Sequence, residues 1–219
     1  MKKHDYKGLL IVIEGTDGSG KSTQIELLKR WLEDKSYGTM ISEWKTSSLI
    51  AQAIDEAKER NLLNATTFSL LYAADFADRL ENTIIPALKS GFVCLLDRYT
   101  YTAFARDVVR GHDETWVKEL YSFAPEPDLV FYLDMPVKTL LKRVIGTTGL
   151  DYWESGKDIG FSKDFYKSFQ IYQTKILEEY EQMKKDYNFI SIDGTDPIYD
   201  IHKQIVDNTS KILVSGKYD

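Results

Sequence analysis

The sequence predicts an α/β fold in which a mostly parallel sheet carries helices on both faces. Apolar runs typical of strands alternate with helical patterns along the whole chain of 219 residues. Two of these runs, residues 92–96 and 128–134, are almost continuously apolar, as expected for strands that are covered on both faces. Such alternation favours parallel strands joined by helical crossovers. No linker, repeat or low-complexity tract interrupts it, so residues 1–219 are expected to form a single domain.

The first part of the chain is expected to alternate strand and helix twice. Residues 9–13 predict a strand, and residues 22–35 predict a helix with one apolar face. Residues 39–42 predict the second strand. One of the two serines at positions 47–48 is expected to cap a helix that continues through residue 60.

A long helical pattern opens near Asn64. Its apolar positions recur at helical spacing, at Leu70, Ala73, Ala77, Leu80, Ile84 and Leu88. Pro86 is expected to kink or end this helix, because proline lacks an N–H and its ring collides with the preceding turn. Gly91 is expected to mark the stop, and residues 92–96 then predict a buried strand.

The middle of the chain continues the alternation. A mixed segment over residues 101–108 is followed by a helix over residues 116–123 and by the strand at 128–134. Pro136 suits the first turn of the next helix, which is expected to end near Val144.

The last part begins with a polar stretch. Residues 146–160 are rich in Gly, Thr and Asp and predict a loop. A long helix follows, with a face expected to pack in the core or a dimer interface: Phe165, Phe169, Tyr172, Ile176 and Tyr180. Residues 188–192 predict the last strand, and a turn at residues 193–197 leads into a terminal helix.

The composition is that of a globular protein that is not adapted to polyanions. Hydrophobic residues make up 43% of the chain, charged residues 28%, and the net charge is −6. A general nucleic-acid-binding protein needs a basic face, so no nucleic-acid partner is expected. The single cysteine, Cys94, lies in an apolar run and excludes a disulfide framework. No secretory leader or membrane-length apolar run is present, which predicts a cytoplasmic protein without a membrane partner.

The segment GTDGSGKS at residues 15–22 lies between the first strand and the first helix. It fits the pattern G-x-x-x-x-G-K-[ST], in which backbone N–H groups and the start of a helix surround the phosphates of a nucleotide. Lys21 is expected to reach the β- and γ-phosphates, and the Ser22 hydroxyl to ligate Mg²⁺.

Further polar residues follow the other strands. Glu43 comes after the second strand, and Asp97 and Arg98 come after the third. Because ligands of parallel α/β sheets bind at the carboxyl ends of strands, these residues are expected to lie near the glycine-rich loop. Asp97 suits Mg²⁺ or its waters, and Arg98 suits a phosphate in transfer. A surface salt bridge between charged residues at the strand end is the alternative interpretation.

At this point the chain resembles the thymidylate kinases, a family of P-loop nucleoside monophosphate kinases. The resemblance covers nearly the whole chain in order. It is carried by residues 13–24, by Leu71-Tyr72-Ala73-Ala74-Asp75, by Ile85-Pro86-Ala87-Leu88 with Gly91, by Asp97-Arg98-Tyr99, and by residues 124–129 leading to Tyr132-Leu133-Asp134.

The resemblance implies a P-loop NTPase fold with a five-stranded parallel sheet, and transfer of the ATP γ-phosphate to dTMP with Mg²⁺ by a homodimer. It implies catalytic roles for Asp17, Lys21, Asp97 and Arg98, with Ser22 and Asp97 at the metal. ATP is expected to contact Gly15, Asp17, Gly18, Ser19, Gly20, Lys21, Ser22, Thr23, Arg143 and Thr195. The acceptor is expected to contact Glu43, Tyr72, Phe76, Arg79, Arg98, Thr102 and Arg106.

Several positions depart from the family pattern. Phe76 stands where members commonly have a base-reading Arg, and Arg79 lies one helical turn further on. The lid segment, about residues 146–160, carries no arginine. The missing cation is expected to come from Arg143, Lys157 or Lys163.

These departures leave three functions open. The first is a dTMP kinase, and the second is a related kinase for another phosphate acceptor. The third is a nucleotide-binding protein with weak transfer activity. Trp44 is expected either to stack on a base or to pack at the mouth of the site, and residues 151–154 to act as a lid or a surface knob.

Overall fold

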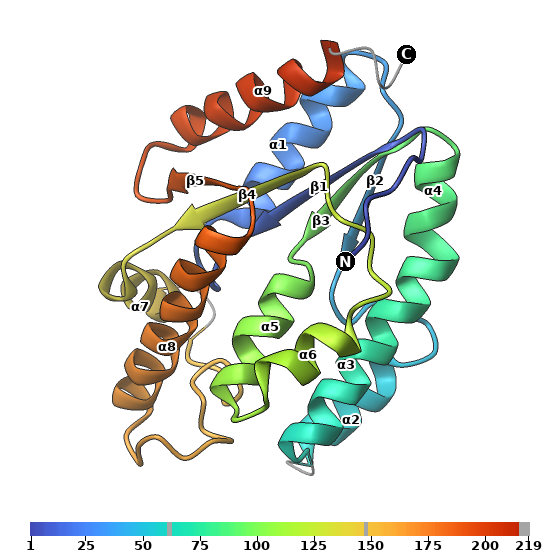
Figure 1. The fold of residues 1–219 in the computed structure, drawn as a ribbon. Helices are drawn as coiled ribbons and strands as arrows, with labels where there is room; N and C mark the ends of the chain where they lie inside the picture. Colours follow the sequence, from blue (N-terminus) through green and yellow to red (C-terminus); the bar gives the residue numbers. More distant parts are fainter. Residues whose placement is uncertain (61–62, 147–148, 215–219) are drawn as a thin grey trace.

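The computed structural model describes residues 1–60, 63–146 and 149–214, and within them the chain forms one five-stranded parallel sheet (Figure 1). The strand order is β2-β3-β1-β4-β5. The strands are β1 Leu9–Glu14, β2 Thr39–Glu43, β3 Val93–Asp97, β4 Leu129–Asp134 and β5 Phe189–Asp193. The predicted α/β fold with a five-stranded parallel sheet is therefore confirmed, and each predicted strand agrees to within a residue.

Helices cover both faces of the sheet (Figure 1). On one face α1 (Lys21–Glu33) and α9 (Ile198–Val214) pack on alternate residues of the strands. The other face is covered by α3 (Ala65–Arg79), α5 (Thr100–Val109) and α8 (Phe165–Asp186). Each face has its own buried apolar cluster, which explains why the inner strands are apolar on both sides.

The helix that carries Pro86 does not end there. After α3 it passes through one π-helical turn, η1 (Leu80–Ile84), and continues as α4 (Ile85–Lys89). The expected kink or end at Pro86 is thus replaced by a turn with i→i+5 bonding, which accommodates the ring and the missing N–H. The helix stops at Ser90, and Gly91 follows with φ 85°, as the sequence predicts.

Two other helices differ from expectation. The helix α2 (Ala51–Glu59) begins later than predicted, because the Ser47 hydroxyl accepts hydrogen bonds from the N–H groups of Leu49 and Ile50 and holds a turn before it. The mixed segment after β3 is the regular helix α5.

The remaining helices lie close to their predicted positions. They are α6 (Glu114–Leu120), which is capped by the Asp113 carboxylate, and α7 (Val137–Gly146). Of the predicted lid segment at 146–160, residues 147–148 lie outside the described part of the chain. None of the described helices combines the length and the apolar content that a bilayer crossing requires.

The register of the sheet brings the predicted site residues to one edge. Ile13 on β1 pairs with Asp97 on β3, and Glu43 on β2 pairs with the same Asp97. The glycine-rich loop after β1 therefore lies beside the residues that follow β2 and β3.

Candidate active site

A cavity of about 730 Å³ opens at the carboxyl ends of β1, β2 and β3. Its walls come from the glycine-rich loop, the ends of β2 and β3, α7, α8 and the segment after residue 149. The lining residues that the sequence predicts are Asp17, Gly18, Gly20, Lys21, Ser22, Thr23, Glu43, Asp97, Arg98 and Arg143. The structure thus brings most of the predicted ATP-binding and catalytic residues together around one space.

The glycine-rich loop has the backbone that its sequence implies. Gly15, Gly18 and Gly20 adopt φ values of 143°, 77° and 98°, a region that residues with a Cβ rarely enter. A Cβ on Gly15 would lie 2.8 Å from the Ser19 hydroxyl and 3.0 Å from a backbone carbonyl of β4. Gly20 caps α1, so the N-terminus of that helix faces the cavity, as anion binding requires.

Lys21 follows the glycines of the loop and is buried beside them. Its amine donates to the Thr16 carbonyl at 3.1 Å and lies 3.8 Å from an Asp97 carboxylate oxygen. Burial, together with the charge of Arg98, lowers the pKa of Lys21. The nearby carboxylates of Asp97, Asp17 and Glu14 act in the opposite direction.

Ser22 and Asp97 meet at the base of the cavity. The Ser22 hydroxyl donates to Asp97 Oδ2 at 2.9 Å. The described residues contain no cluster of three or more carboxylate, histidine or cysteine ligands. Mg²⁺ does not need one, because it usually keeps several waters and binds one or two protein oxygens with substrate phosphates. The oxygen pair therefore fits Mg²⁺.

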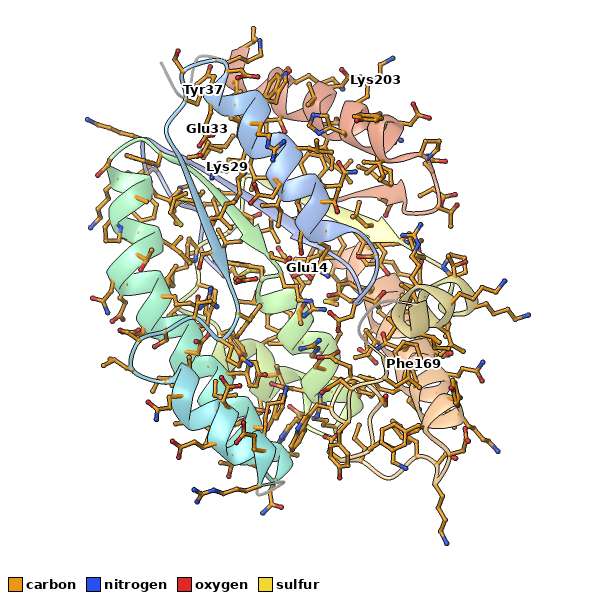
Figure 2. All side chains as sticks on the ribbon, turned by 180° about the vertical axis from the view of Figure 1, so that it is seen from behind. Glu14, Lys29, Glu33, Tyr37, Phe169 and Lys203 are labelled. Carbon is orange, nitrogen blue, oxygen red and sulfur yellow. The ribbon has the colours of Figure 1, made fainter. Side chains whose placement is uncertain are left out.

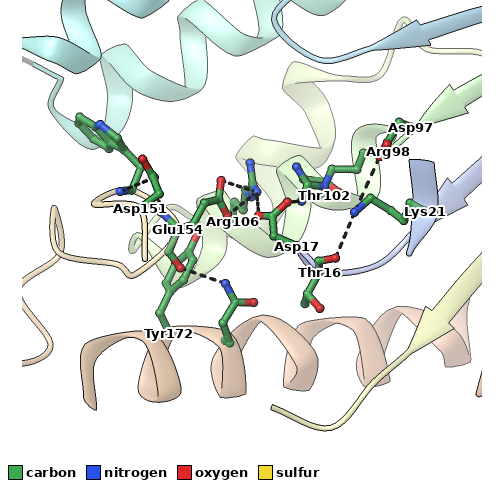
Figure 3. A network of polar contacts seen from close by, with 12 residues as sticks. Thr16, Asp17, Lys21, Asp97, Arg98, Thr102, Arg106, Asp151, Glu154 and Tyr172 are labelled. Carbon is green, nitrogen blue, oxygen red and sulfur yellow. Dashed lines mark hydrogen bonds and ion pairs between the residues drawn. The ribbon is translucent and has the colours of Figure 1, made fainter. Parts of the chain in front are cut away.

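Two arginines face the glycine-rich loop (Figure 3). Arg98 forms an ion pair with Asp17, and Arg106 on α5 lies 3.4 Å from the other Asp17 oxygen. Burial would raise the pKa of Asp17, but the charge of Arg98 holds it well below its usual range. Arg98 has a left-handed backbone with φ 70°, and its N–H donates to the Ile13 carbonyl at 3.0 Å.

The predicted lid is folded over this pair. Glu154 accepts hydrogen bonds from Arg106 at 2.7 and 2.8 Å, and its carbonyl accepts one from Gln173 on α8 at 3.0 Å. Beside it, Trp153 is buried and stacks on Phe68 of α3, with ring centroids 5.6 Å apart. Burial raises the pKa of Glu154, Arg106 lowers it and Asp17 raises it, to about 7 in sum. Carboxylates thus pair with the guanidinium groups of both Arg98 and Arg106.

Glu14 is a buried residue of the site region that the sequence did not single out (Figure 2). Its carboxylate accepts bonds of 2.7 Å from the Tyr99 N–H, from the Thr102 hydroxyl on α5 and from the Tyr180 hydroxyl on α8. Burial raises the pKa of Glu14, and these three bonds lower it. The residue fixes α5 and α8 to the strand that bears the glycine-rich loop. The feature of the sequence that could have identified Glu14 is its position, as a carboxylate at the end of an apolar strand.

The predicted acceptor residues on α3 lie in an aromatic cluster. Phe68 stacks on Tyr72 at 4.5 Å between centroids, and Trp44 stacks on Phe76 at 5.3 Å. Tyr72 lines a small cavity beside the main one, and Trp44 lines both. Phe76 is fully buried beneath Trp44 and lines neither.

Of the other predicted acceptor residues, some line a cavity and one is held in the interior. Arg79 pairs with Asp75 at 2.9 Å and donates to the Ser42 hydroxyl at 2.8 Å, so its guanidinium is held in the interior. Glu43 lines the main cavity at the end of β2. Thr102 lines the small cavity, although its hydroxyl donates to Glu14.

Arg143 lies over the glycine-rich loop. Its guanidinium donates to the carbonyls of Gly18 and Gly194, both at 3.3 Å. A further cavity of about 180 Å³ lies there, lined by Ser19, Gly20, Thr23, Gln24, Arg143, Gly194, Asp196, Ile198 and Ile201. Thr195 borders this region and donates its hydroxyl to Asp193 at 2.6 Å. In contrast, Lys157 donates to the carbonyls of Ser162 and Lys163, within its own loop.

The parallel sheet, the glycine-rich loop and the arginines that face it define a nucleotide-binding protein of the P-loop class. Residues 13–205 match the family model for thymidylate kinase. The chain belongs to the thymidylate kinase family, and the resemblance found in the sequence is confirmed.

Named relatives agree with the family model. A probable thymidylate kinase 2 of Saccharolobus solfataricus is 46% identical over 91% of this chain and 94% of its own. A probable thymidylate kinase of Pyrococcus horikoshii is 35% identical over 91% and 95%. A thymidylate kinase of Schizosaccharomyces pombe is 29% identical over 97% of both chains. The similarity therefore extends over nearly the full length of each protein.

Proposed function

We propose that this protein transfers the γ-phosphoryl group of ATP to dTMP, which yields ADP and dTDP. The observation that carries the proposal is the position of two arginines at a complete phosphate loop: Arg98 lines the main cavity, and both Arg98 and Arg106 pair with Asp17 of the loop. Phosphoryl transfer needs positioning and charge neutralisation, and the acceptor phosphate needs no strong base. The membership of the family supports dTMP as the acceptor.

The proposed arrangement assigns a role to each part of the site. ATP binds the loop at residues 15–22, with Lys21 at the β- and γ-phosphates and Mg²⁺ at Ser22 and Asp97. The metal neutralises phosphate charge when it is bound. Arg98 and Arg106 release Asp17 and Glu154 and bind the acceptor phosphate instead. Arg143, already placed over the loop, supplies the cation that the lid segment lacks.

The test is ADP release with ATP and Mg²⁺ and each nucleoside monophosphate in turn. Release that depends on dTMP supports the proposal. Release with a different monophosphate alone would move the specificity to another acceptor. ATP binding without any acceptor-dependent release would contradict the kinase assignment and favour a nucleotide-binding role.

A further inference from the structure

A second, small cavity lies next to the main one, between α3, α5 and the C-terminal end of α6. It has a volume of about 10 Å³ and shares Trp44 with the main cavity. Its other lining residues are Phe68, Tyr72, Thr102, Ala103, Arg106, Asp107 and Tyr121. Half of the lining residues are aromatic, and a few polar side chains stand among them, a combination that is common in small-molecule sites.

Three polar atoms of this wall are buried and have no hydrogen-bond partner among the described residues. They are Asp107 Oδ2, the Tyr121 hydroxyl and the Trp44 indole N–H. Asp107 is 2% exposed and Tyr121 0%. An unpartnered buried polar group costs about 1–3 kcal/mol, and three around one cavity are unusual enough to require an explanation. A ligand that pairs with them supplies one.

The three atoms present a defined pattern. Burial raises the pKa of the Asp107 carboxyl to about 6, and a hydrogen bond from the Ser69 hydroxyl lowers it by a smaller amount. At pH 7.5 the ionised carboxylate therefore predominates. The carboxylate accepts hydrogen bonds, while the indole can only donate one and the phenol can donate one. Trp44 and Tyr121 are neighbours, with ring centroids 6.1 Å apart. The wall thus offers one acceptor and two donors.

We infer that Asp107 reads the base of the acceptor nucleotide, with Tyr121 and Trp44 as donors, and that the base has an N–H flanked by carbonyl groups. Thymine has this edge, because its N3–H lies between O2 and O4. Cytosine has a lone pair at N3, which a carboxylate repels. The inference rests on the proposed function and names the residues that give it base specificity.

The residues first expected to read the base leave this task open. Phe76 has no polar atom and is fully buried, and Arg79 is held by Asp75 and Ser42. Tyr72 and Phe68 provide flat faces on which the ring can stack. The cavity has room for one water at most, so the base binds only when the partly exposed Trp44 moves.

Two conservative variants and a control test the inference. Asp107→Asn keeps the shape of the side chain but replaces a carboxylate, which only accepts hydrogen bonds, with an amide that also donates them. Tyr121→Phe removes only the hydroxyl group. Glu119→Gln, an exposed carboxylate on α6, is the matched control. Calorimetric titration with dTMP and with dCMP, without ATP, gives the affinities, and ADP release gives kcat and KM.

We expect Asp107→Asn to weaken dTMP binding by about 10- to 100-fold, as for a lost hydrogen bond to a charged group. Its affinity for dCMP should fall less or rise, because an amide can donate to N3 of cytosine. Tyr121→Phe should weaken dTMP binding by about 3- to 10-fold and leave the melting temperature unchanged or higher, because an unpartnered hydroxyl disappears. The change should lie mainly in KM for the acceptor.

Wild-type affinity for dTMP in a folded Asp107→Asn variant would overturn the inference. So would a Tyr121→Phe variant that melts earlier and binds dTMP normally, since both results assign the side chains to packing or to a buried water. Should Asp107→Asn fail to fold, Tyr121→Phe decides alone. Wild-type protein that binds dTMP without transferring phosphate would contradict the proposed function. The affinities of the variants for dTMP and dCMP would then still decide whether Asp107 reads the base. Protein that does not bind dTMP would overturn both.

Discussion

Four charged side chains of the site form a connected set of ion pairs. Arg98 and Arg106 face Asp17, and Arg106 also binds Glu154. In the proposed function, the acceptor phosphate replaces these carboxylates on the arginines. Mutations at these positions should therefore change catalysis and pH dependence in ways that can be separated.

Arg98→Ala tests the phosphate clamp. We expect kcat for ADP release with dTMP to fall by about 10³ or more, as for the loss of an arginine that stabilises transferred phosphate. ATP affinity should change little, because the loop and Lys21 remain. Calorimetry and the ADP assay measure the two quantities, with Arg30→Ala on the exposed surface of α1 as the control. Unchanged turnover in Arg98→Ala would contradict the role.

Glu154→Gln tests the raised pKa in the lid. Because burial raises the folded pKa of Glu154 from 4.5 to about 7, its ionisation is unfavourable in the folded state. The stability that this group contributes is complete below pH 4.5 and is lost as the pH rises through 7. The pKa of Asp17 is lowered, so Asp17 acts with the opposite sign: the stability that it contributes is present above its usual pKa of 3.8 and is lost as the pH falls below that value.

The wild type should therefore lose stability between pH 5 and pH 8 relative to Glu154→Gln, by about 1–3 kcal/mol. Urea unfolding at both pH values measures the difference. Glu178→Gln, an exposed position on α8, serves as the control. Parallel pH profiles for the wild type and Glu154→Gln would refute the assignment.

At the level of single residues, the glycine-rich loop could be predicted from the sequence, because its residues are consecutive. Lys21 and Ser22 follow from local spacing, and Arg98 follows from a strand end. Glu14 and Asp107 were missed, because their significance depends on partners far along the chain. Tyr180, which binds Glu14, lies 166 positions away. Packing between distant helices leaves no local pattern in the sequence.

The π-helical turn before Pro86 is the element that departs most from expectation. It adds a residue between α3 and α4, and one residue corresponds to a rotation of about 100° in an α-helix. Deletion of the exposed Asn82 should convert the turn to α-helix. That change would place the Pro86 ring against a carbonyl and rotate Tyr72 away from the cavity.

We expect the deletion to lower the free energy of unfolding by about 3 kcal/mol or more, the usual effect of proline inside an α-helix. Asn82→Ala keeps the residue count and loses one exposed hydrogen bond to Asp78, so it should remain within about 0.5 kcal/mol of wild type. Urea unfolding compares them. Equal stability of the two variants would show that the turn is dispensable.

Helix existence was predictable from periodicity, whereas helix boundaries were not. The helical spacing of the apolar residues Leu80, Ile84 and Leu88 correctly predicted one long helix. Whether Pro86 interrupts it depended on a change of hydrogen bonding that hydrophobic spacing does not reveal. The start of α2 depended likewise on bonds made by the Ser47 side chain.

At the scale of the molecule, substrate binding should stabilise the fold through both halves of the cavity. ATP with Mg²⁺ at about 100 times its Kd should add about 2.7 kcal/mol, roughly 5–10 °C in melting temperature for a chain of this size. Lys21→Ala should lose most of this shift and retain the shift caused by dTMP. Thermal melts with each ligand alone measure this. A Lys21→Ala protein with an undiminished ATP shift would contradict the loop assignment.

The proposed homodimer has its own test. Light scattering should give a mass near twice 25.2 kDa at micromolar concentration. A monomer mass in active protein would exclude an obligate dimer. The parallel direction of the strands was predictable, because buried runs alternate with helices, whereas their order in the sheet was not predicted. The association of two chains was inferred only from the family.

The backbone of Arg98 has a final consequence. A non-glycine residue in the left-handed region costs about 1–2 kcal/mol, and glycine at this turn would avoid that strain. Arg98→Gly should therefore be more stable than Arg98→Ala and equally unable to transfer phosphate. The ion pair with Asp17 offsets this backbone strain in the wild type, so both variants should unfold more readily than wild type at neutral pH. Position 98 is thus a place where backbone preference alone would select glycine, and the side chain is what selects arginine.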